Sequence, residues 1–292
     1  MSVPMRRPST VSPNVDGRDT GRRVPGALMS RWVTPPNKPP AIEIRALTKR
    51  YQDIVALDGM DITIEDGEIV ALLGPSGCGK STLLKIVAGL YPPTSGRVLL
   101  FGDPVVKPRR EVGLMFQSPV LFPWLTVIDN VLLPIKIRRE SSQEALDQAH
   151  DLLEFAGLAG FEDRYPWQLS GGMQQRAAMC RMLIGQPAVS LLDEPFGAID
   201  AMNREYLDVE VRSMIVRAGG SAIFVTHNVA EAIFVSDRVI ILTPRPGRIA
   251  GDVSVKLAQS GRTKQMLSSP ELLQHVTEIR GILDAFDERA DP

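Results

Sequence analysis

The stretch of this sequence best suited to binding phosphate is a glycine-rich run that ends in a lysine and a serine. Residues 74–81 read GPSGCGKS, follow an apolar run at 69–73 and precede a helical pattern at 82–90. Glycines at this spacing let backbone N–H groups surround phosphate oxygens, and the following helix N-terminus favours negative charge. Lys80 would reach the β- and γ-phosphates, and Ser81 can ligate Mg²⁺. The predicted phosphate-binding residues are Gly74, Pro75, Ser76, Gly77, Cys78, Gly79, Lys80, Ser81 and Thr82.

Two adjacent acids are the second candidate for chemistry. Asp193 and Glu194 follow the run VSLL at 189–192, and parallel-sheet enzymes place ligand groups at the carboxyl ends of their strands. Alone, such acids more often mark a turn or the start of a helix. Beside a complete phosphate loop, we expect Asp193 to hold Mg²⁺, through water, and Glu194 to orient and polarise an attacking water.

The elements that must position these residues alternate between short β-rich runs and helical patterns, which favours a parallel sheet with crossover helices. Residues 118–186 are predicted to be mainly helical, with a capping box from Ser141 to Glu144 and a stop at Gly157. An apolar stripe after Pro270, which includes Leu272, Leu273, Val276, Ile279 and Leu283, predicts a docked amphipathic helix. The predicted strands are 42–45, 61–64, 69–73, 97–101, 112–116, 188–192, 222–226 and 238–242.

Composition describes an ordinary globular chain of 292 residues. The 33 basic and 34 acidic residues give a net charge of −1, which argues against a nucleic-acid partner. Two cysteines cannot form a disulfide framework, and no apolar run reaches the length of a membrane span. Residues 1–40 hold eight of the 23 prolines and a basic excess, so we expect a disordered leader there.

The run LSGGMQQR at 169–176 resembles the signature sequence of ATP-binding cassette (ABC) proteins. Ser170 is a good N-cap, and Met173, Ala177, Cys180 and Ile184 would give the following helix a buried stripe. The resemblance covers roughly residues 41–260. It implies an α/β fold: a P-loop NTPase (RecA-like) core with an antiparallel β subdomain and an inserted α-helical subdomain at about 118–186. Residues 261–292 would form a helical tail.

Other family motifs follow in order, and their roles are implied by the resemblance. Tyr51 is similar to the residue that stacks on adenine, and Gln117 to the glutamine that contacts Mg²⁺ and couples to a transmembrane partner. Asp200 lies in the loop similar to the one that crosses the dimer interface, and His227 looks like the switch histidine at the γ-phosphate. Ser190, Ile199 and Asn228 depart from the commonest pattern without removing a group that touches nucleotide. His150 and His275 have no such support and are expected to be surface residues.

The resemblance also implies how two such chains would work. Each ATP would lie between the phosphate loop of one chain and Ser170, Gly171 and Gly172 of the other, so that neither subunit holds a complete site. Glu194 would be the general base, His227 would position the γ-phosphate and water, and Lys80 would stabilise charge. The implied ligands of Mg²⁺ are Ser81, Gln117 and Asp193.

The resemblance points further to an importer ATPase at the cytoplasmic face of the inner membrane. Residues 121–127 (LFPWLTV) and 244–249 (PRPGRI) resemble the nitrate, sulfonate and taurine group. Alone, the first is a helix start and the second a Pro-Gly turn. The partners would be a second cassette, a separate permease and, through it, an extracytoplasmic solute-binding protein. The alternatives are a soluble ABC ATPase without a transport role and an exporter ATPase with a separate permease.

Overall fold

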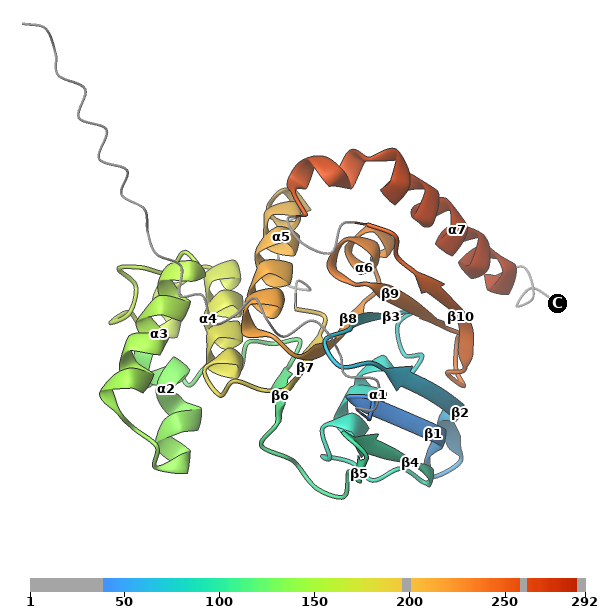
Figure 1. The fold of residues 1–292 in the computed structure, drawn as a ribbon, viewed down its shortest axis with the longest axis horizontal. Helices are drawn as coiled ribbons and strands as arrows, with labels where there is room; N and C mark the ends of the chain where they lie inside the picture. The colour runs from blue at the N-terminus through green and yellow to red at the C-terminus, as the bar shows by residue number, and fades with distance from the viewer. Residues whose placement is uncertain (1–38, 196–200, 258–261, 288–292) are drawn as a thin grey trace, which may run out of the picture. The chain divides into compact units, whose positions relative to one another are not determined.

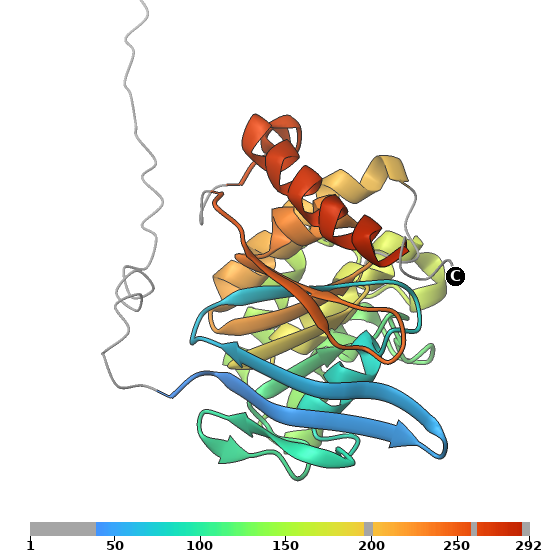
Figure 2. The ribbon, with the colours of Figure 1, turned by 90° about the vertical axis from the view of Figure 1, so that its right-hand side faces the viewer.

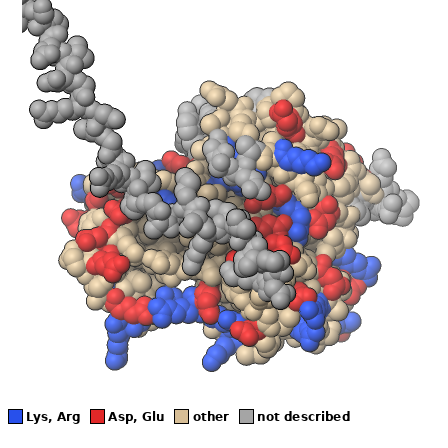
Figure 3. All heavy atoms as spheres, in the orientation of Figure 1, with Lys and Arg blue, Asp and Glu red and all other residues tan. Residues whose placement is uncertain are grey.

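The computed structural model describes residues 39–195, 201–257 and 262–287 (Figure 1). Residues 1–38 of the predicted leader, and Asp200, lie outside the described residues. Two sheets and seven α-helices are described there. None of the helices in the described part is both long and apolar enough to span a membrane. Figure 3 shows acidic and basic side chains interspersed on one face.

A six-stranded sheet forms the centre, in the order β10-β9-β3-β8-β7-β6. Its inner strands pair in parallel, and β10 joins the edge antiparallel to β9. The sequence predicted five of the strands to within a residue or two and missed β10. The strands are β3 (Ile69–Leu73), β6 (Val112–Met115), β7 (Val189–Asp193), β8 (Ser221–Thr226), β9 (Arg238–Leu242) and β10 (Ile249–Ser254).

The antiparallel subdomain is a separate four-stranded sheet in the order β2-β1-β4-β5. Its first two strands are much longer than predicted, because bulges let the pairing of β1 with β2 continue where strict alternation stops. The two-residue β5 was not predicted. The bounds are β1 (Ile42–Tyr51), β2 (Ile54–Ile64), β4 (Ser95–Leu100) and β5 (Asp103–Pro104).

The central sheet buries both faces. Alternate residues of β3 point to opposite faces of the sheet. Val70 and Leu72 pack with α1 (Lys80–Val87) and the antiparallel sheet. Ile69, Ala71 and Leu73 belong to the core on the other face. That second core also takes in side chains from α4 (Gly171–Leu183), α5 (Ala201–Ala218) and α6 (Val229–Val235). Burial on both faces explains why these strands are continuous apolar runs.

The inserted helices α2 (Val127–Arg138), α3 (Gln143–Phe155) and α4 lie side by side (Figure 1). Ser142, and not Ser141, caps α3 by accepting a hydrogen bond from the Ala145 N–H. The capping-box prediction was therefore wrong, because the third helical residue is Ala145 and not a glutamate that could return the bond. Gly157 has φ +66 directly after the C-cap, which confirms the predicted stop.

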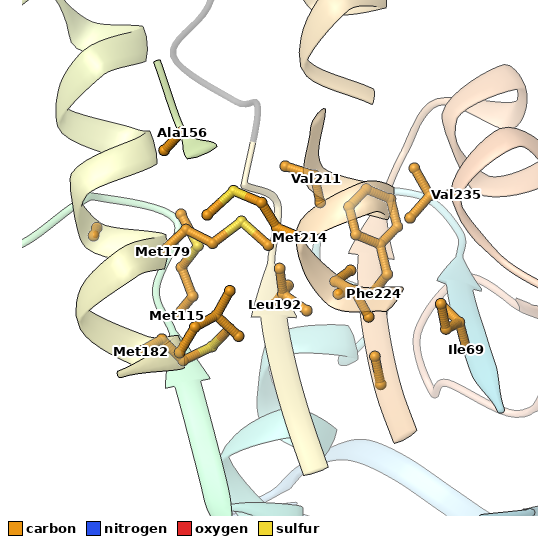
Figure 4. Packing of buried hydrophobic residues seen from close by; sticks show 14 of the residues in the cluster. Ile69, Met115, Ala156, Met179, Met182, Leu192, Val211, Met214, Phe224 and Val235 are labelled. Carbon is orange, nitrogen blue, oxygen red and sulfur yellow. The ribbon is translucent and has the colours of Figure 1, made fainter. Parts of the chain in front are cut away.

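Methionines join the inserted helices to the central sheet. Met179 and Met182 of α4 point toward Met115 of β6 and Leu192 of β7, beside Met214 of α5 (Figure 4). Unbranched thioethers fill irregular gaps between elements that meet at different angles. The predicted stripe of α4 is buried at Ala177, Cys180 and Ile184.

The C-terminal helix α7 (Pro270–Asp287) lies over α6 and the β10 edge (Figure 2). Leu272 and Ile279 are buried as predicted, but Leu273 is exposed because it falls outside the packed face. His275 is not a free surface residue: its Nε2 accepts a hydrogen bond from the Lys256 backbone N–H at 3.1 Å. The expectation for His275 was wrong, whereas His150 is exposed as expected.

Two buried arginines hold the C-terminal end of the short helix α6. One guanidinium nitrogen of Arg262 donates to the carbonyl oxygens of Ile233, Phe234 and Ser236 at 2.6–2.9 Å. Arg212 of α5 donates to the Val235 carbonyl and to Asp237. Burial, and then the neighbouring Arg212, lower the pKa of Arg262 to about 10, with Asp237 opposing. These contacts satisfy the last carbonyls of a seven-residue helix.

Arg262→Met is therefore expected to destabilise the protein by about 3 kcal/mol, because buried carbonyls at the end of α6 lose their partner. Urea unfolding of the full chain measures this loss. Arg280→Met, on the exposed side of α7, is the matched control and should stay within about 0.5 kcal/mol of wild type. Equal stability of the two variants would show that the Arg262 contacts contribute nothing.

Candidate functional site

An open pocket of about 400 Å³ lies between the phosphate loop and the end of the antiparallel sheet. Its lining contains half of the site residues that the sequence singled out, together with three that it did not. Its lining residues are Tyr51, Ile54, Ala56, Ser76, Gly77, Gly79, Lys80, Ser81, Thr82, Gln117, Glu194 and Arg245.

Sheet register explains why distant residues meet here. Leu73 of β3 pairs with Thr226 of β8, and Asp193 of β7 pairs with Val225. The strands run in parallel, so their carboxyl ends share one edge of the sheet. The phosphate loop, the acidic pair and His227 leave the sheet at that edge.

The phosphate loop leads from β3 into α1. Gly79 is the N-cap of α1 at φ +106, where a Cβ would lie 2.6 Å from the Leu57 side chain, so only glycine fits. Lys80 is buried, and its Nζ donates to the carbonyl oxygens of Gly74 at 2.7 Å and Pro75 at 3.0 Å. Burial raises the pKa of the Cys78 thiol, which suits a neutral packing role. The loop is thus already in a closed conformation, with the Lys80 ammonium bound to the carbonyl oxygens of the loop itself.

Ser81 and Asp193 form the polar pair behind the phosphate loop. Ser81 Oγ donates to Asp193 Oδ1 at 2.9 Å. Asp193 is buried, and this desolvation raises the pKa of its carboxyl, with the Ser81 hydrogen bond opposing. A hydroxyl and a buried carboxylate are hard oxygen ligands, which suit a divalent cation such as Mg²⁺.

The carboxylate of Glu194 is contacted by two of the other predicted site residues, Gln117 and His227. The backbone of Glu194 is in the left-handed region at φ +44, and its N–H donates to the Val225 carbonyl at 3.0 Å. One carboxylate oxygen accepts a hydrogen bond from Gln117 Nε2 at 3.1 Å, and the other lies 3.5 Å from His227 Nδ1. A strained non-glycine residue held in this way is typical of a functional position.

His227 owes its position to the start of α6. Asn228 caps that helix by accepting hydrogen bonds from the N–H groups of Ala230 and Glu231, and its own N–H donates to Thr226 Oγ1. His227 is therefore fixed between β8 and a capped helix, with its side chain 52% exposed. The ring faces Glu194 and retains access to the open side of the site.

The predicted glycine pair of the signature run lies elsewhere. Ser170 is exposed and caps α4 by accepting from the Met173 N–H at 3.3 Å, as predicted. Among the described residues that line the pocket, none comes from 170–172. A link exists all the same, since buried Gln175 donates to the Gln117 carbonyl at 3.4 Å. A single chain therefore brings together the phosphate loop, Gln117, Glu194 and His227, but leaves Ser170 outside.

Three lining residues, Ile54, Ala56 and Arg245, were not singled out as site residues by the sequence. The first two belong to the part of β2 that was not predicted. Arg245 stands in the run PRPGRI, whose Pro-Gly turn is visible in sequence but whose contact with the phosphate loop is not.

Asp193→Asn should lower ATP turnover by about two orders of magnitude while raising the thermal stability of the nucleotide-free protein. The buried carboxyl has a raised pKa, so the native state binds its proton more tightly than the unfolded state. The carboxyl of Asp193 therefore contributes less to the stability of the protein as the pH rises from the pKa of the unfolded state through the raised pKa of the folded state. Asparagine removes this cost and can still accept from Ser81. The melting temperatures of wild type and Asp193→Asn, measured across pH 4–8 (roughly the range of carboxyl titration), check this expectation. Melting temperatures that change in parallel with pH in the two proteins would contradict it.

Comparisons with known proteins identify the family of this chain. The family model described as ABC transporter matches residues 57–197. An aliphatic sulfonates import ATP-binding protein of Burkholderia cenocepacia is 44% identical over 254 residues, 86% of this chain and 90% of that protein. A taurine import ATP-binding protein of Pelagibacter ubique is 40% identical over 82% of this chain and 92% of its own. A nitrate import ATP-binding protein of Synechocystis is 38% identical over the same shares.

Among solved structures, a dimeric post-hydrolysis ATP-binding cassette bound to ADP and Pi superposes with a TM-score of 0.66 at 30% identity. It covers 74% of this chain and all of its own. The predicted fold class is confirmed by this likeness and by the two sheets. With its phosphate loop, acidic pair and histidine at one sheet edge, the chain belongs to the ABC transporter family and is an ATP-binding, ATP-hydrolysing member of it.

Proposed function

We propose that this chain is the ATPase subunit of an importer for a small anionic solute of the nitrate, sulfonate or taurine kind, working as a dimer beneath a separate permease. The observation that carries the ATPase part is the convergence of Gln117 and His227 on Glu194 beside the phosphate loop. The importer part is supported by relatives named for sulfonate, taurine and nitrate import, each aligned over more than four fifths of the chain.

Roles for the catalytic residues follow from their contacts. Glu194 would take the proton of the attacking water, because its carboxylate is held by Gln117 and faces His227. Lys80 and the loop amides would stabilise charge on the phosphates. His227 would position the γ-phosphate and the water. Tyr51, half exposed at the pocket wall, would stack on adenine.

The residues that would hold Mg²⁺ are Ser81, Asp193 and Gln117. These groups would hold an ion whose charge offsets the negative charge that develops during hydrolysis. The Ser81 hydroxyl and the Asp193 carboxylate already lie 2.9 Å apart. Asp193, with its raised pKa, would become fully ionised when it meets the cation.

A second copy of the chain would complete the site. Ser170, Gly171 and Gly172 open a helix N-terminus that can accept an anion, yet none of them lines the pocket of their own chain among the described residues. The solved cassette to which the chain is similar is described as dimeric. Two chains facing head to tail would place each Ser170 against the partner's phosphate loop, and ATP would bridge them. Asp200 of the predicted interface loop lies outside the described residues.

The permease would dock on the exposed aromatic surface formed by Phe122, Trp124, Tyr165 and Trp167. Trp124 and Trp167 are 68% and 65% exposed, and Tyr165 stacks on Trp167 at 4.5 Å between centroids. Large apolar side chains held in solvent mark interaction sites. Backbone hydrogen bonds from Val127 to Arg164 and from Ile128 to Glu162 bring the two segments together.

A short segment of chain connects this aromatic surface to the catalytic centre. Buried Asn130 accepts from the Phe122 N–H and donates to the carbonyl oxygens of Phe122, Leu125 and Thr126. That loop begins a few residues after Gln117, whose side chain donates to Glu194. Movement of a permease against Trp124 would reach the general base through this short segment and Gln117.

Purification of the tagged full chain from gently solubilised membranes, with mass identification of its partners, tests the proposal. Stoichiometric recovery of a polytopic permease supports it, and ATPase stimulation of that complex by a solute-binding protein loaded with taurine, a sulfonate or nitrate identifies the solute. Recovery from the soluble fraction alone, or on ribosomes or DNA, would favour the soluble ABC class. A permease complex that exports would favour the exporter alternative. Placement at the cytoplasmic membrane face is part of the same proposal.

A further inference from the structure

Arg245 brings a second positive charge to the nucleotide pocket. It lies in the segment 243–248, TPRPGR, which joins β9 to β10. Its Nε and one terminal nitrogen donate to the Gly77 carbonyl of the phosphate loop at 3.3 and 3.2 Å. Among the described residues that line the pocket, the cations are Lys80 and Arg245.

The segment that carries Arg245 is fixed to both walls of the pocket. Gly247 donates its N–H to the Ala56 carbonyl and accepts from the Asp58 N–H, each at 3.0 Å, which attaches the segment to β2. A Cβ on Gly247 would lie 2.1 Å from the Cys78 carbonyl oxygen, so the segment packs directly on the phosphate loop. Arg248 adds an ion pair to Asp58. The backbone at Arg245 is therefore positioned independently of its own side chain.

The contact that Arg245 makes in the structure uses only part of the hydrogen-bonding capacity of its guanidinium and leaves its charge without a charged acceptor in this contact. Two N–H groups share one neutral carbonyl at the long end of hydrogen-bond distance, on a side chain that is exposed. A guanidinium binds phosphate bidentately and more strongly than it binds a carbonyl, because the acceptor is charged. Lys80, in contrast, is buried and already engaged by two carbonyls. A polyphosphate carries more negative charge than one lysine balances.

We infer that Arg245 binds the phosphate chain of the nucleotide, as a second cation on the side of the pocket that the loop after β9 covers. This inference rests on the ATP binding described above and adds to it a residue outside the phosphate loop. In the absence of nucleotide, the Gly77 carbonyl holds the guanidinium beside the place where the phosphates enter. On binding, the arginine exchanges this neutral acceptor for a charged one.

Calorimetric titration of the full chain with ATP and Mg²⁺ tests the inference, using Arg245→Gln, Arg245→Lys and the control Arg110→Gln. Glutamine can still donate to the Gly77 carbonyl but has lost the charge. We expect Arg245→Gln to weaken ATP binding about 10-fold and Arg245→Lys less, since lysine keeps the charge without the planar fork. Arg110, which is exposed and pairs with Glu140, lies outside the pocket lining, so Arg110→Gln should bind as wild type. Affinity should also depend less on salt in Arg245→Gln than in wild type.

Wild-type affinity in Arg245→Gln would overturn the inference while leaving ATP binding established. A loss of affinity with the salt dependence of wild type would also overturn it, because Arg245 would then only brace the loop. Failure of the wild-type chain itself to bind ATP would overturn both this inference and the ATP site. Thermal unfolding of each nucleotide-free variant checks that the fold is retained.

Discussion

Glu194→Gln is expected to lower ATP turnover at least about 100-fold while leaving ATP binding intact. Glutamine has nearly the same shape and can still meet Gln117 and His227, which surround the carboxylate at 3.1 and 3.5 Å. It cannot accept a proton from water. In the proposed dimer, ATP bound between the two chains would then stay unhydrolysed, so the variant should accumulate as a nucleotide-bound dimer. Steady-state phosphate release and size-exclusion chromatography with ATP measure the two effects.

The matched control for Glu194→Gln is Glu140→Gln. Glu140 is an exposed glutamate that pairs with Arg110 on the surface, far along the chain from the phosphate loop. Its loss should leave turnover within about two-fold of wild type, since exposed ion pairs contribute little. Near-normal turnover in Glu194→Gln would refute its assignment as the general base. Failure of that variant to bind ATP would instead show that Glu194 is needed to shape the site.

Residues on the central sheet could be predicted from sequence because both faces of that sheet are buried. Strands such as β3 and β9 are short apolar runs between turn residues, and their observed bounds match the predicted ones. The antiparallel sheet was harder to predict. β1 and β2 alternate only in part, and bulges near Leu47 and Lys49 interrupt the period on which a strand prediction depends. Their pairing is a tertiary contact that no local pattern contains.

The site residues also differ in whether local sequence or tertiary packing determines their position. The phosphate loop and Glu194 were visible because the chemistry fixes both residue types and spacing, and the resemblance to ABC proteins supplied Gln117 and His227. Arg245 was not assigned to the site, because its position depends on the packing of Gly247 against Cys78. Likewise, Ser142 rather than Ser141 caps α3, since two adjacent serines offer the same side chain and only backbone geometry selects one.

Ser170 and Ser142 are chemically the same residue in two different places. Each caps an inserted helix by accepting one backbone N–H, at 3.3 Å for Ser170 and 3.2 Å for Ser142. Both are exposed, and neither lines the pocket of its own chain. Any effect on helix stability should therefore be shared by the two serines. An effect on ATP turnover at only one of them would come from contact with another chain.

Ser170→Arg is therefore expected to lower ATP turnover about 100-fold, whereas Ser142→Arg should keep it within about two-fold of wild type. In the proposed dimer, an arginine at position 170 would block the helix N-terminus that faces the ATP of the partner chain, yet it leaves the pocket of its own chain untouched. Binding of ATP to the isolated monomer should accordingly be unchanged in both variants, and both should lose about 1 kcal/mol of stability with the cap. Phosphate release, ATP titration at low protein concentration and urea unfolding separate these three quantities. Equal turnover in the two variants would contradict a site shared between chains. Loss of ATP binding by the Ser170→Arg monomer would instead place Ser170 in the pocket of its own chain.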